Sequence, residues 1–342
     1  MVYQNKKRVE IKKMIDKSNM RQTILDFPGQ FKIGLEAAKS AKLKGKFDSI
    51  VVCGMGGSAM GAEILESWME ENDISFPVLI HRDYGLPEKA GKKSLVICVS
   101  NSGSTEETLS AFNLALRRNL PLLALGSGGR LIEECKKNNV PFSLMPKGYQ
   151  TRMTLGFQFS SLLKIASNCG VLPDKSKELA SLGKTLNPAS LEAEGKRIAK
   201  KIRNRIPIIY SSSLNKNLAE IWKINFNENS KVPSFFNVFP EMNHNEMAGY
   251  SFGKKGASPF FFLMLEDIKD QKRIKERMDL TCKILEKRGG ECEILKMKDK
   301  NFLRKFFSSV ILSYWASWHL ALMKGADPSE LKIVEEFKKE LR

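Results

Sequence analysis

Two kinds of apolar pattern alternate along the chain from residue 47 onward. Short runs of consecutive apolar residues, typical of buried strands, are each followed by a longer segment in which apolar residues recur at helical spacing. The expected strands are 49–54, 77–83, 95–100 and 120–129, and the expected helices are 62–71, 106–118 and 131–138. This alternation predicts βαβ units, in which a parallel sheet is flanked by helices.

The same alternation begins again in the C-terminal half of the chain. The expected strands are 206–212, 258–267 and 292–298, and the expected helices are 214–229, 272–289 and 306–322. A passage rich in proline, phenylalanine and asparagine interrupts this second series, and "LPDKSK" and "LNPAS" indicate a connection between the halves. We therefore expect an α/β protein of two three-layer αβα sandwiches. Their expected bounds are an N-terminal helical segment at 1–34, a first domain at 35–165, a connection at 166–189 and a second domain at 190–342.

Composition restricts the class of protein. The chain has 342 residues, of which 42% are hydrophobic, so it can bury a sizeable core. We find no apolar run near the ~18 to 20 residues of a membrane span, and the charged N-terminus lacks a secretory apolar region. These features predict a soluble, cytoplasmic protein without a membrane partner. The net charge of +18 is spread over segments that mix both signs, and no nucleic-acid motif is present, so we expect no nucleic-acid partner.

The cysteines and histidines give little sign of metal chemistry. The six cysteines are scattered without a CxxC pair, and we expect them to be reduced, mostly structural thiols. The three histidines, His81, His244 and His319, do not stand at metal-ligand spacing, so neither a metal nor a cofactor is expected. His319 lies in an apolar helical pattern, which favours a core position.

Glycines gather in "VVCGMGGSAMGAEIL", at residues 51–65, between an expected strand and an expected helix. Such glycines let the backbone turn tightly and present N–H groups at a helix N-terminus, where anions bind. The segment is neither a dinucleotide fingerprint, because Ala59 stands where GxGxxG needs its third glycine, nor a Walker loop, because it lacks Gly-Lys-Ser/Thr. An anion site is therefore the prediction.

A second corner, "LVICVSNSGSTEET", follows the expected strand at 95–100. Its hydroxyl groups, on Ser100, Ser102, Ser104 and Thr105, could complete a phosphate site together with backbone N–H groups. The alternative is ordinary capping, with Ser102 or Ser104 as the N-cap. Two such corners on one sheet favour a ligand site, because parallel sheets bind ligands beyond the carboxyl ends of their strands.

Together, these two corners resemble the paired motifs of the SIS, or sugar isomerase, domain. With "NENSK" at 227–231 and "PEMNHNEMAGY" at 240–250, the chain resembles the bifunctional phosphoglucose/phosphomannose isomerase family of the phosphoglucose isomerase superfamily. The resemblance extends to the closing "WHLALMKGADPSELKIVEEFKKEL". It implies two SIS-type domains with the active site between them, and an aldose–ketose isomerase of glucose 6-phosphate, fructose 6-phosphate and mannose 6-phosphate. It also implies a homodimer in which His244 is contributed across the interface.

The resemblance assigns roles to particular residues. Glu228 takes the position of the base that moves a proton through a cis-enediol(ate), and His244 that of the ring-opening residue. Arg152 and Lys338 take the positions of cations that reach the substrate, although Thr151 replaces a usual proline and Lys339 leaves the register of Lys338 open. The phosphate-binding residues would be Gly56, Gly57, Ser58, Ser100, Ser102, Gly103 and Thr105.

Alternatives to this interpretation remain open. Glu228 without the resemblance would be an exposed helix-end acid paired with Lys231. Asn101 and Ser104 replace the tyrosine and asparagine of the usual family loop, which makes acceptance of mannose 6-phosphate less secure than that of glucose 6-phosphate. A non-catalytic phosphosugar-binding regulator would use the same cradle, but we see no helix-turn-helix module in the first 35 residues. An aminosugar synthase would need an N-terminal cysteine nucleophile and an amidotransferase domain, and the chain has neither.

Overall fold

The computed structural model describes residues 15–341, so residues 1–14 of the expected helical segment at 1–34 lie outside the described residues. The chain forms two compact units. The first unit comprises residues 26–186, and the second comprises residues 187–341 together with 15–25. The boundaries differ from those expected from the sequence, because helix α3 (Gly29–Ala37) and helix α8 (Ser176–Thr185) both belong to the first unit.

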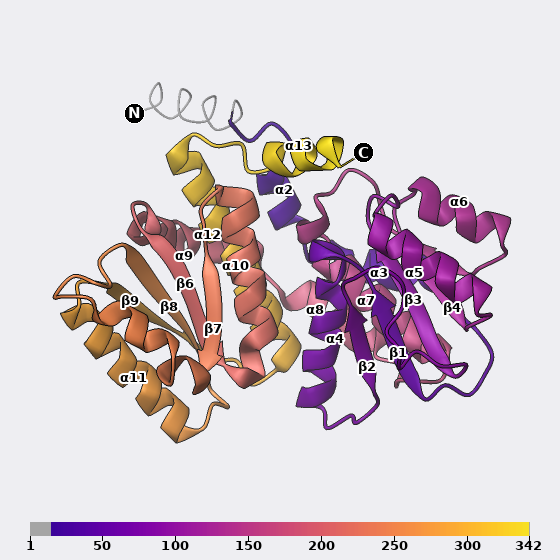
Figure 1. Ribbon diagram of the computed structural model, residues 1–342, viewed down its shortest axis with the longest axis horizontal. Coiled ribbons are helices and arrows are strands. Elements are labelled where there is room, and N and C mark those ends of the chain that lie inside the picture. Colours follow the sequence, from indigo (N-terminus) through magenta and orange to yellow (C-terminus); the bar gives the residue numbers. More distant parts are fainter. Residues whose placement is uncertain (1–14, 342) are drawn as a thin grey trace. The chain divides into compact units, whose positions relative to one another are not determined.

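The first unit is built on a five-stranded parallel sheet in the order β2-β1-β3-β4-β5 (Figure 1). Its strands are β1 (Ser49–Cys53), β2 (Val78–His81), β3 (Ser94–Ser100), β4 (Leu122–Gly126) and β5 (Phe142–Leu144). Its other helices are α4 (Met60–Glu71), α5 (Glu106–Arg117), α6 (Gly129–Lys137) and α7 (Leu155–Asn168). The chain order reverses between β1 and β3, which makes the carboxyl ends of these two neighbours a topological switch point.

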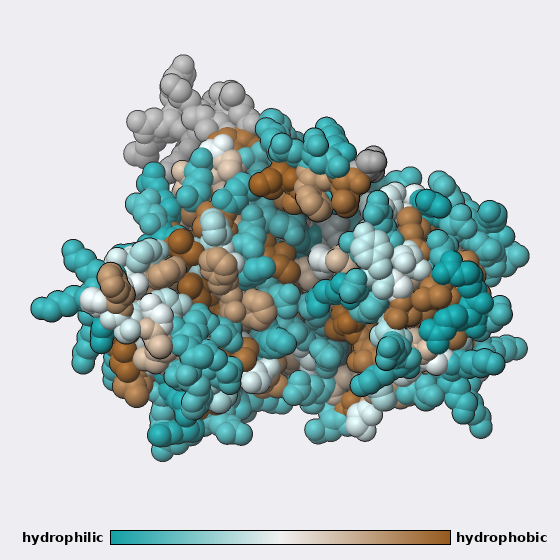
Figure 2. All heavy atoms as spheres, viewed as in Figure 1, coloured by the Kyte–Doolittle hydropathy of each residue, from teal (hydrophilic) through white to brown (hydrophobic). Residues whose placement is uncertain are grey.

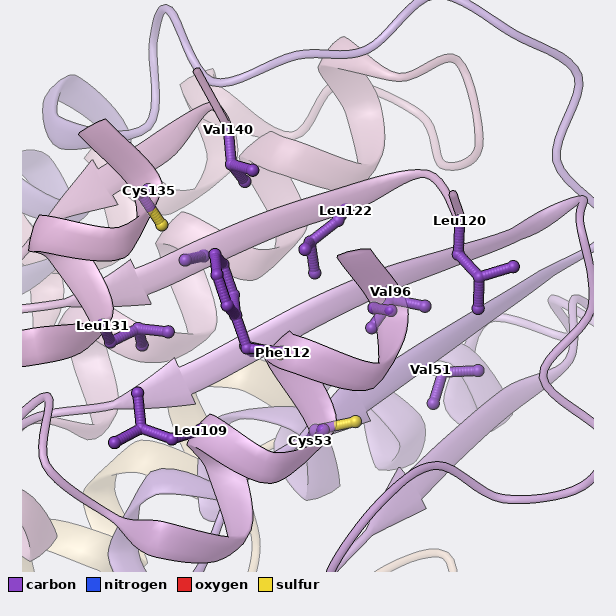
Figure 3. Close-up of a cluster of buried hydrophobic side chains, with 14 of the residues drawn as sticks. Val51, Cys53, Val96, Leu109, Phe112, Leu120, Leu122, Leu131, Cys135 and Val140 are labelled. Atoms are coloured by element: carbon purple, nitrogen blue, oxygen red, sulfur yellow. The ribbon is translucent and has the colours of Figure 1, made fainter. Parts of the chain in front are cut away.

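Both faces of this sheet are buried. On one face, Phe112 from α5 and Leu131 from α6 pack over Val96 and Leu122 of the sheet (Figure 3). Successive residues of a strand point to opposite faces of the sheet. Ile97, which follows Val96 in β3, is buried as well, as are all the other residues of that strand. This two-sided burial explains why the strands appear in the sequence as continuous apolar runs rather than as alternating ones.

The second unit has a four-stranded parallel sheet in the order β7-β6-β8-β9. Its strands are β6 (Ile206–Ser212), β7 (Phe235–Phe239), β8 (Phe260–Asp267) and β9 (Glu291–Met297). Its helices are α2 (Met20–Leu25), α9 (Pro188–Ile202), α10 (Lys216–Ser230), α11 (Lys272–Lys287), α12 (Phe302–Lys324) and α13 (Lys332–Glu340). The predicted α/β class, with two parallel sheets flanked by helices, is confirmed.

Helix α12 corrects one statement from the sequence, because Phe302–Lys324 is long and apolar enough by composition to cross a membrane. Most of its apolar window is buried within the protein, and it packs against α9 and α10 of the same unit. It is therefore a core helix of the second unit. Its buried Lys305 forms an ion pair with Asp267, which lies at the end of β8.

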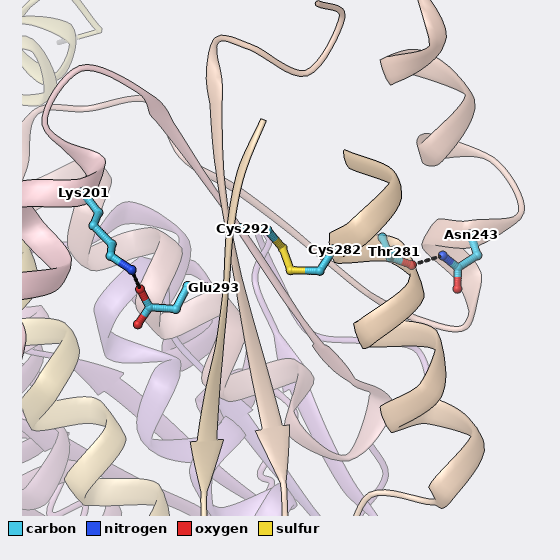
Figure 4. The surroundings of a disulfide bond; sticks show 6 residues. All are labelled: Lys201, Asn243, Thr281, Cys282, Cys292 and Glu293. Carbon is cyan, nitrogen blue, oxygen red and sulfur yellow. Dashed lines mark hydrogen bonds and ion pairs between the residues drawn. A yellow bond between two sulfur atoms is a disulfide. The ribbon is translucent and has the colours of Figure 1, made fainter. Parts of the chain in front are cut away.

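The expectation that all six cysteines are reduced is wrong for two of them. Cys282 of α11 and Cys292 of β9 form a disulfide, with their Cα atoms 5.5 Å apart (Figure 4). The two residues are ten positions apart in the sequence, and the turn between α11 and β9 places them next to each other. Cys53, Cys98, Cys135 and Cys169 are free and buried.

Some elements were not expected from the sequence. The sequence of strand β7 was taken for an irregular passage, because Asn237 lies within it and Pro233 and Pro240 flank it. Prolines are tolerated there because β7 is an edge strand of the sheet. Helix α8 lies within the expected connection at 166–189, and α9 begins at its end. Asn187 caps α9, since its Oδ1 accepts a hydrogen bond from Ser190 N, and Pro188 occupies the first helical position.

Candidate functional site

The glycine-rich corner forms a tight turn between β1 and α4. A short 3₁₀ helix at Gly56–Ser58 makes this turn, and Gly56 has a φ of +49°, which side chains rarely allow. Helix α4 then begins at Met60 without a capping side chain. No residue of the turn caps α4 with its side chain, and the N–H of Gly61 in the first turn donates instead to Gln158 Oε1 at 3.2 Å.

The hydroxyl-rich corner follows β3 and leads into α5. The N-cap of α5 is Thr105, and no side-chain hydrogen bond caps the helix, so capping by Ser102 or Ser104 is not what the structure shows. The Thr105 hydroxyl lies 2.9 Å from Ser100 Oγ, which also accepts a hydrogen bond from Gly103 N at 3.0 Å. Ser102 is exposed, and its Oγ accepts from Ser104 N at 3.3 Å. The hydroxyl groups thus shape the loop itself rather than the helix end.

The two corners meet at the switch point between β1 and β3. Asn101 N donates to Ser58 Oγ at 3.3 Å, which joins the second corner directly to the first. Gly103 is required at this place, because its φ is +70° and an added Cβ would lie 1.9 Å from Gly128 O. The residues expected to bind phosphate therefore lie at the edge where parallel sheets of this topology bind ligands.

Arg152 lies beside the glycine corner. It belongs to a 3₁₀ helix at Thr151–Met153 and is buried. A Cβ added at Gly57 would lie only 3.0 Å from Arg152 N, so a larger residue there would push against the backbone of Arg152. Gln158 of α7 fixes this contact, since its Nε2 donates to Gly57 O at 2.9 Å and its Oε1 accepts from Gly61 N at 3.2 Å. Sequence analysis did not single out Gln158, because a lone glutamine in an apolar helix carries no motif.

Glu228 lies in the last turns of α10, where it is half-buried. It lines a cavity of about 900 Å³ within the second unit, together with the start of β7, the α12–α13 connection and the first turn of α13. Lys231 ends the helix in a left-handed conformation, and its Nζ donates to the backbone oxygen of Glu228 at 2.7 Å. Lys231 thus caps the end of the helix through the backbone oxygen of Glu228.

His244 follows a 3₁₀ helix at Glu241–Asn243, beyond the end of β7, and its side chain is exposed. Lys338 lies in the last turn of α13 and is exposed, as is Lys339. Neither lysine lines the cavity at Glu228, which reaches only the first turn of that helix. Apolar side chains gather along α13 on the face shown in Figure 2, and Ile333 and Phe337 are among its exposed residues.

The two other histidines occupy structural positions. His319 is buried in α12, with its ring centroid 4.8 Å from that of Trp318, as expected for a core histidine. His81 ends β2, and its Nε2 lies 3.4 Å from Tyr84 O. Within residues 15–341, no three His, Cys, Asp or Glu side chains are grouped closely enough to hold a metal ion.

The fold and the joined corners define the class as a SIS-type α/β protein, and the comparisons agree. The bacterial phospho-glucose isomerase C-terminal SIS domain matches residues 191–341. The C-terminal domain of glucosamine-fructose-6-phosphate aminotransferase from Francisella tularensis superposes with a TM-score of 0.68, covering 91% of this chain and 98% of that one. Its sequence identity is 16%, so this likeness concerns the fold alone.

Two relatives of known name then show the family. The bifunctional phosphoglucose/phosphomannose isomerase of Aquifex aeolicus is 38% identical over 296 residues, which are 86% of this chain and 91% of that protein. The protein of the same name from Caldicellulosiruptor bescii is 33% identical over 335 residues, covering 94% of this chain and 98% of that protein. The chain belongs to the bifunctional phosphoglucose/phosphomannose isomerase family.

Proposed function

We propose that the protein interconverts glucose 6-phosphate and fructose 6-phosphate, and mannose 6-phosphate and fructose 6-phosphate. The observation that carries this proposal is the identity of 38% over most of the chain to an isomerase of that name. The joined corners at β1 and β3 support it, because they offer hydroxyl groups and, at α5, a helix N-terminus without a side-chain cap to an anion. A phosphate held there needs no cofactor, and we propose that the reaction takes place in the cytoplasm.

The chemistry requires a ring opening followed by movement of one proton between C1 and C2. We assign the proton transfer to Glu228, a half-buried residue that lines a cavity of about 900 Å³ in the second unit. We assign the ring opening to His244, because imidazole can donate or accept a proton near neutral pH. Arg152 and Lys338 would stabilise the negative charge that develops on the cis-enediolate.

The first experiment is conversion of glucose 6-phosphate and of mannose 6-phosphate into fructose 6-phosphate by the EDTA-treated protein. Activity on both supports the bifunctional proposal. Activity on glucose 6-phosphate alone would restrict it and direct attention to Asn101 and Ser104, where the loop departs from the family pattern. Binding of both sugar phosphates without turnover would contradict the proposed isomerase activity and favour a phosphosugar-binding regulator.

We further propose a homodimer in which His244 of one protomer serves the site of the other. The exposure of His244 on its loop is consistent with such sharing. Mixing two inactive variants, Glu228→Gln and His244→Asn, tests it, because a mixed dimer would contain one site with both residues intact. Recovery of about a quarter of the wild-type activity after subunit exchange is expected. No recovery, with mixed dimers present, would place both residues in the same protomer.

A further inference from the structure

The loop that carries His244 is fastened on both sides of the histidine. On its C-terminal side, Glu246 accepts three hydrogen bonds. Its Oε1 accepts from the hydroxyl groups of Tyr210 at 2.6 Å and Tyr250 at 2.9 Å, and its Oε2 accepts from Asn237 Nδ2 at 2.6 Å. Because Tyr210 lies on β6 and Asn237 is its register partner on β7, these bonds attach the loop to two strands of the sheet.

The partners of Glu246 are held in the form that donates. Tyr210 and Tyr250 are buried, and burial raises the pKa of both phenol groups, as does the neighbouring Glu246 carboxylate. Both phenols therefore remain protonated donors at any working pH. The Asn237 amide is also fixed in orientation, because its Oδ1 accepts from Val238 N at 2.8 Å, which leaves Nδ2 to face the carboxylate.

On the N-terminal side, Asn243 attaches the loop to α11. Its Nδ2 donates to Thr281 Oγ1 at 2.9 Å, and its Oδ1 accepts from Arg277 Nη1 at 3.2 Å. Thr281 is buried and precedes Cys282, whose disulfide joins α11 to β9 (Figure 4). The histidine thus stands between one anchor on the sheet and one on a helix that is covalently tied to it.

From this geometry we propose that Glu246 is a positioning residue for His244. The proposal rests on the proposed role of His244 in ring opening. Glu246 does not touch the substrate in this account; it sets the place of the imidazole by holding the following residues of the loop against β6 and β7. A displacement of about 1 Å at a reacting group can cost about 100-fold in rate, so a loose loop would lower turnover without loss of phosphosugar binding.

The test uses a pair of substitutions that exchange donor and acceptor. Glu246→Gln leaves one amide oxygen where the carboxylate offered two, so whichever way the amide turns, either the two phenols or Asn237 Nδ2 loses its acceptor. We expect kcat on glucose 6-phosphate to fall about 10- to 100-fold, with KM changed less than about threefold. Adding Asn237→Asp restores an acceptor at that place, and the double variant should recover most of the lost kcat.

A spectroscopic readout separates positioning from general damage. The chain has three histidines, so the His244 ring resonance can be identified by its loss in His244→Asn. Glu246→Gln should shift or broaden that resonance but leave His81 unchanged, and the double variant should restore it. The matched control is Glu241→Gln, because a glutamine oxygen can still accept from Asn245 Nδ2, so kcat and the resonance should stay at their wild-type values.

Each result decides one question. A kcat of Glu246→Gln equal to that of the wild type, or a lower kcat with an unchanged His244 resonance, overturns the positioning role. Failure of the double variant to recover kcat, when it is folded by circular dichroism, also overturns it. If the wild-type protein itself does not isomerise phosphosugars, the proposed function fails, and the His244 resonance alone still tests whether Glu246 holds the loop.

Discussion

Replacing Lys305 with alanine would leave a buried carboxylate without its cation. Lys305 Nζ lies 2.7 Å from Asp267 Oδ2 and 2.8 Å from Oδ1, and the two side chains are 2% and 1% exposed. Asp267 also accepts hydrogen bonds from Asn215 Nδ2 at 3.1 Å and from Lys269 N at 2.9 Å. These neutral donors cannot replace the lost charge.

The expected loss of unfolding free energy is about 3–5 kcal/mol, the usual cost of breaking a buried ion pair from one side. The double variant Lys305→Met/Asp267→Asn should be less destabilised than Lys305→Ala, because it removes the charge of Asp267 together with its cation. The matched control is Arg273→Ala, since its ion pair with Glu276 lies on the surface, with 78% of the arginine side chain exposed. That change should cost about 0–0.5 kcal/mol.

Urea unfolding followed by tryptophan fluorescence measures this loss. Three of the four tryptophans, Trp222, Trp315 and Trp318, are buried in the second unit with Lys305, and Trp68 is in the first. A Trp68→Phe background therefore makes the signal specific to the second unit, even if the two units unfold in separate steps. If Lys305→Ala costs no more than Arg273→Ala, the reasoning from burial is refuted.

Three further changes test the packing and charges of the second unit. Gly195→Ala should lower the melting temperature and cost about 1–3 kcal/mol, because an added Cβ would lie 2.3 Å from Trp315 Cβ; an unchanged melting curve would contradict the close contact. Reducing the disulfide should cost about 2–3 kcal/mol for a loop closed over ten positions, measured by urea unfolding with and without dithiothreitol, and no change would show that the bond does not form in solution. Although burial raises the pKa of Glu293, hydrogen bonds from Arg197 and Lys201 outweigh it and hold this pKa below 4.5. The stabilisation by this charged group is therefore present above pH 4.5 and is lost as the pH falls below it. Glu293→Gln should lower the free energy of unfolding by about 1–2 kcal/mol at about pH 7 and by less at about pH 3. A loss that does not depend on pH would refute the assignment.

The parallel sheets were predictable because their strands are buried on both faces and so appear as uninterrupted apolar runs. Strand β7 was not, since Pro233 and Pro240 flank it and only its place at the sheet edge permits them. The phosphate corners were visible as glycine and hydroxyl clusters, whereas the contact of Gly57 with Arg152 depends on chain segments almost a hundred positions apart. Periodicity cannot report such a contact.

The anchors of the His244 loop show the same limit. Glu246 lies within the motif "PEMNHNEMAGY", yet nothing in the motif indicates that its carboxylate accepts a hydrogen bond from Tyr210, which lies on β6. The disulfide between Cys282 and Cys292 was also missed, because one cysteine is on a helix and the other on a strand, and their spacing matches no common pattern. Long-range pairing of side chains has to be read from the fold.

The most direct test of the central claim is the effect of Glu228→Gln on proton transfer, measured by NMR with glucose 6-phosphate in D₂O. The wild-type protein should form fructose 6-phosphate and introduce solvent deuterium at the carbons between which the proton moves. The variant should bind glucose 6-phosphate with unchanged affinity, while its rates of turnover and of deuterium incorporation fall by at least about 100-fold. Turnover and deuterium incorporation at the wild-type rates would contradict the account and remove Glu228 from the role of base.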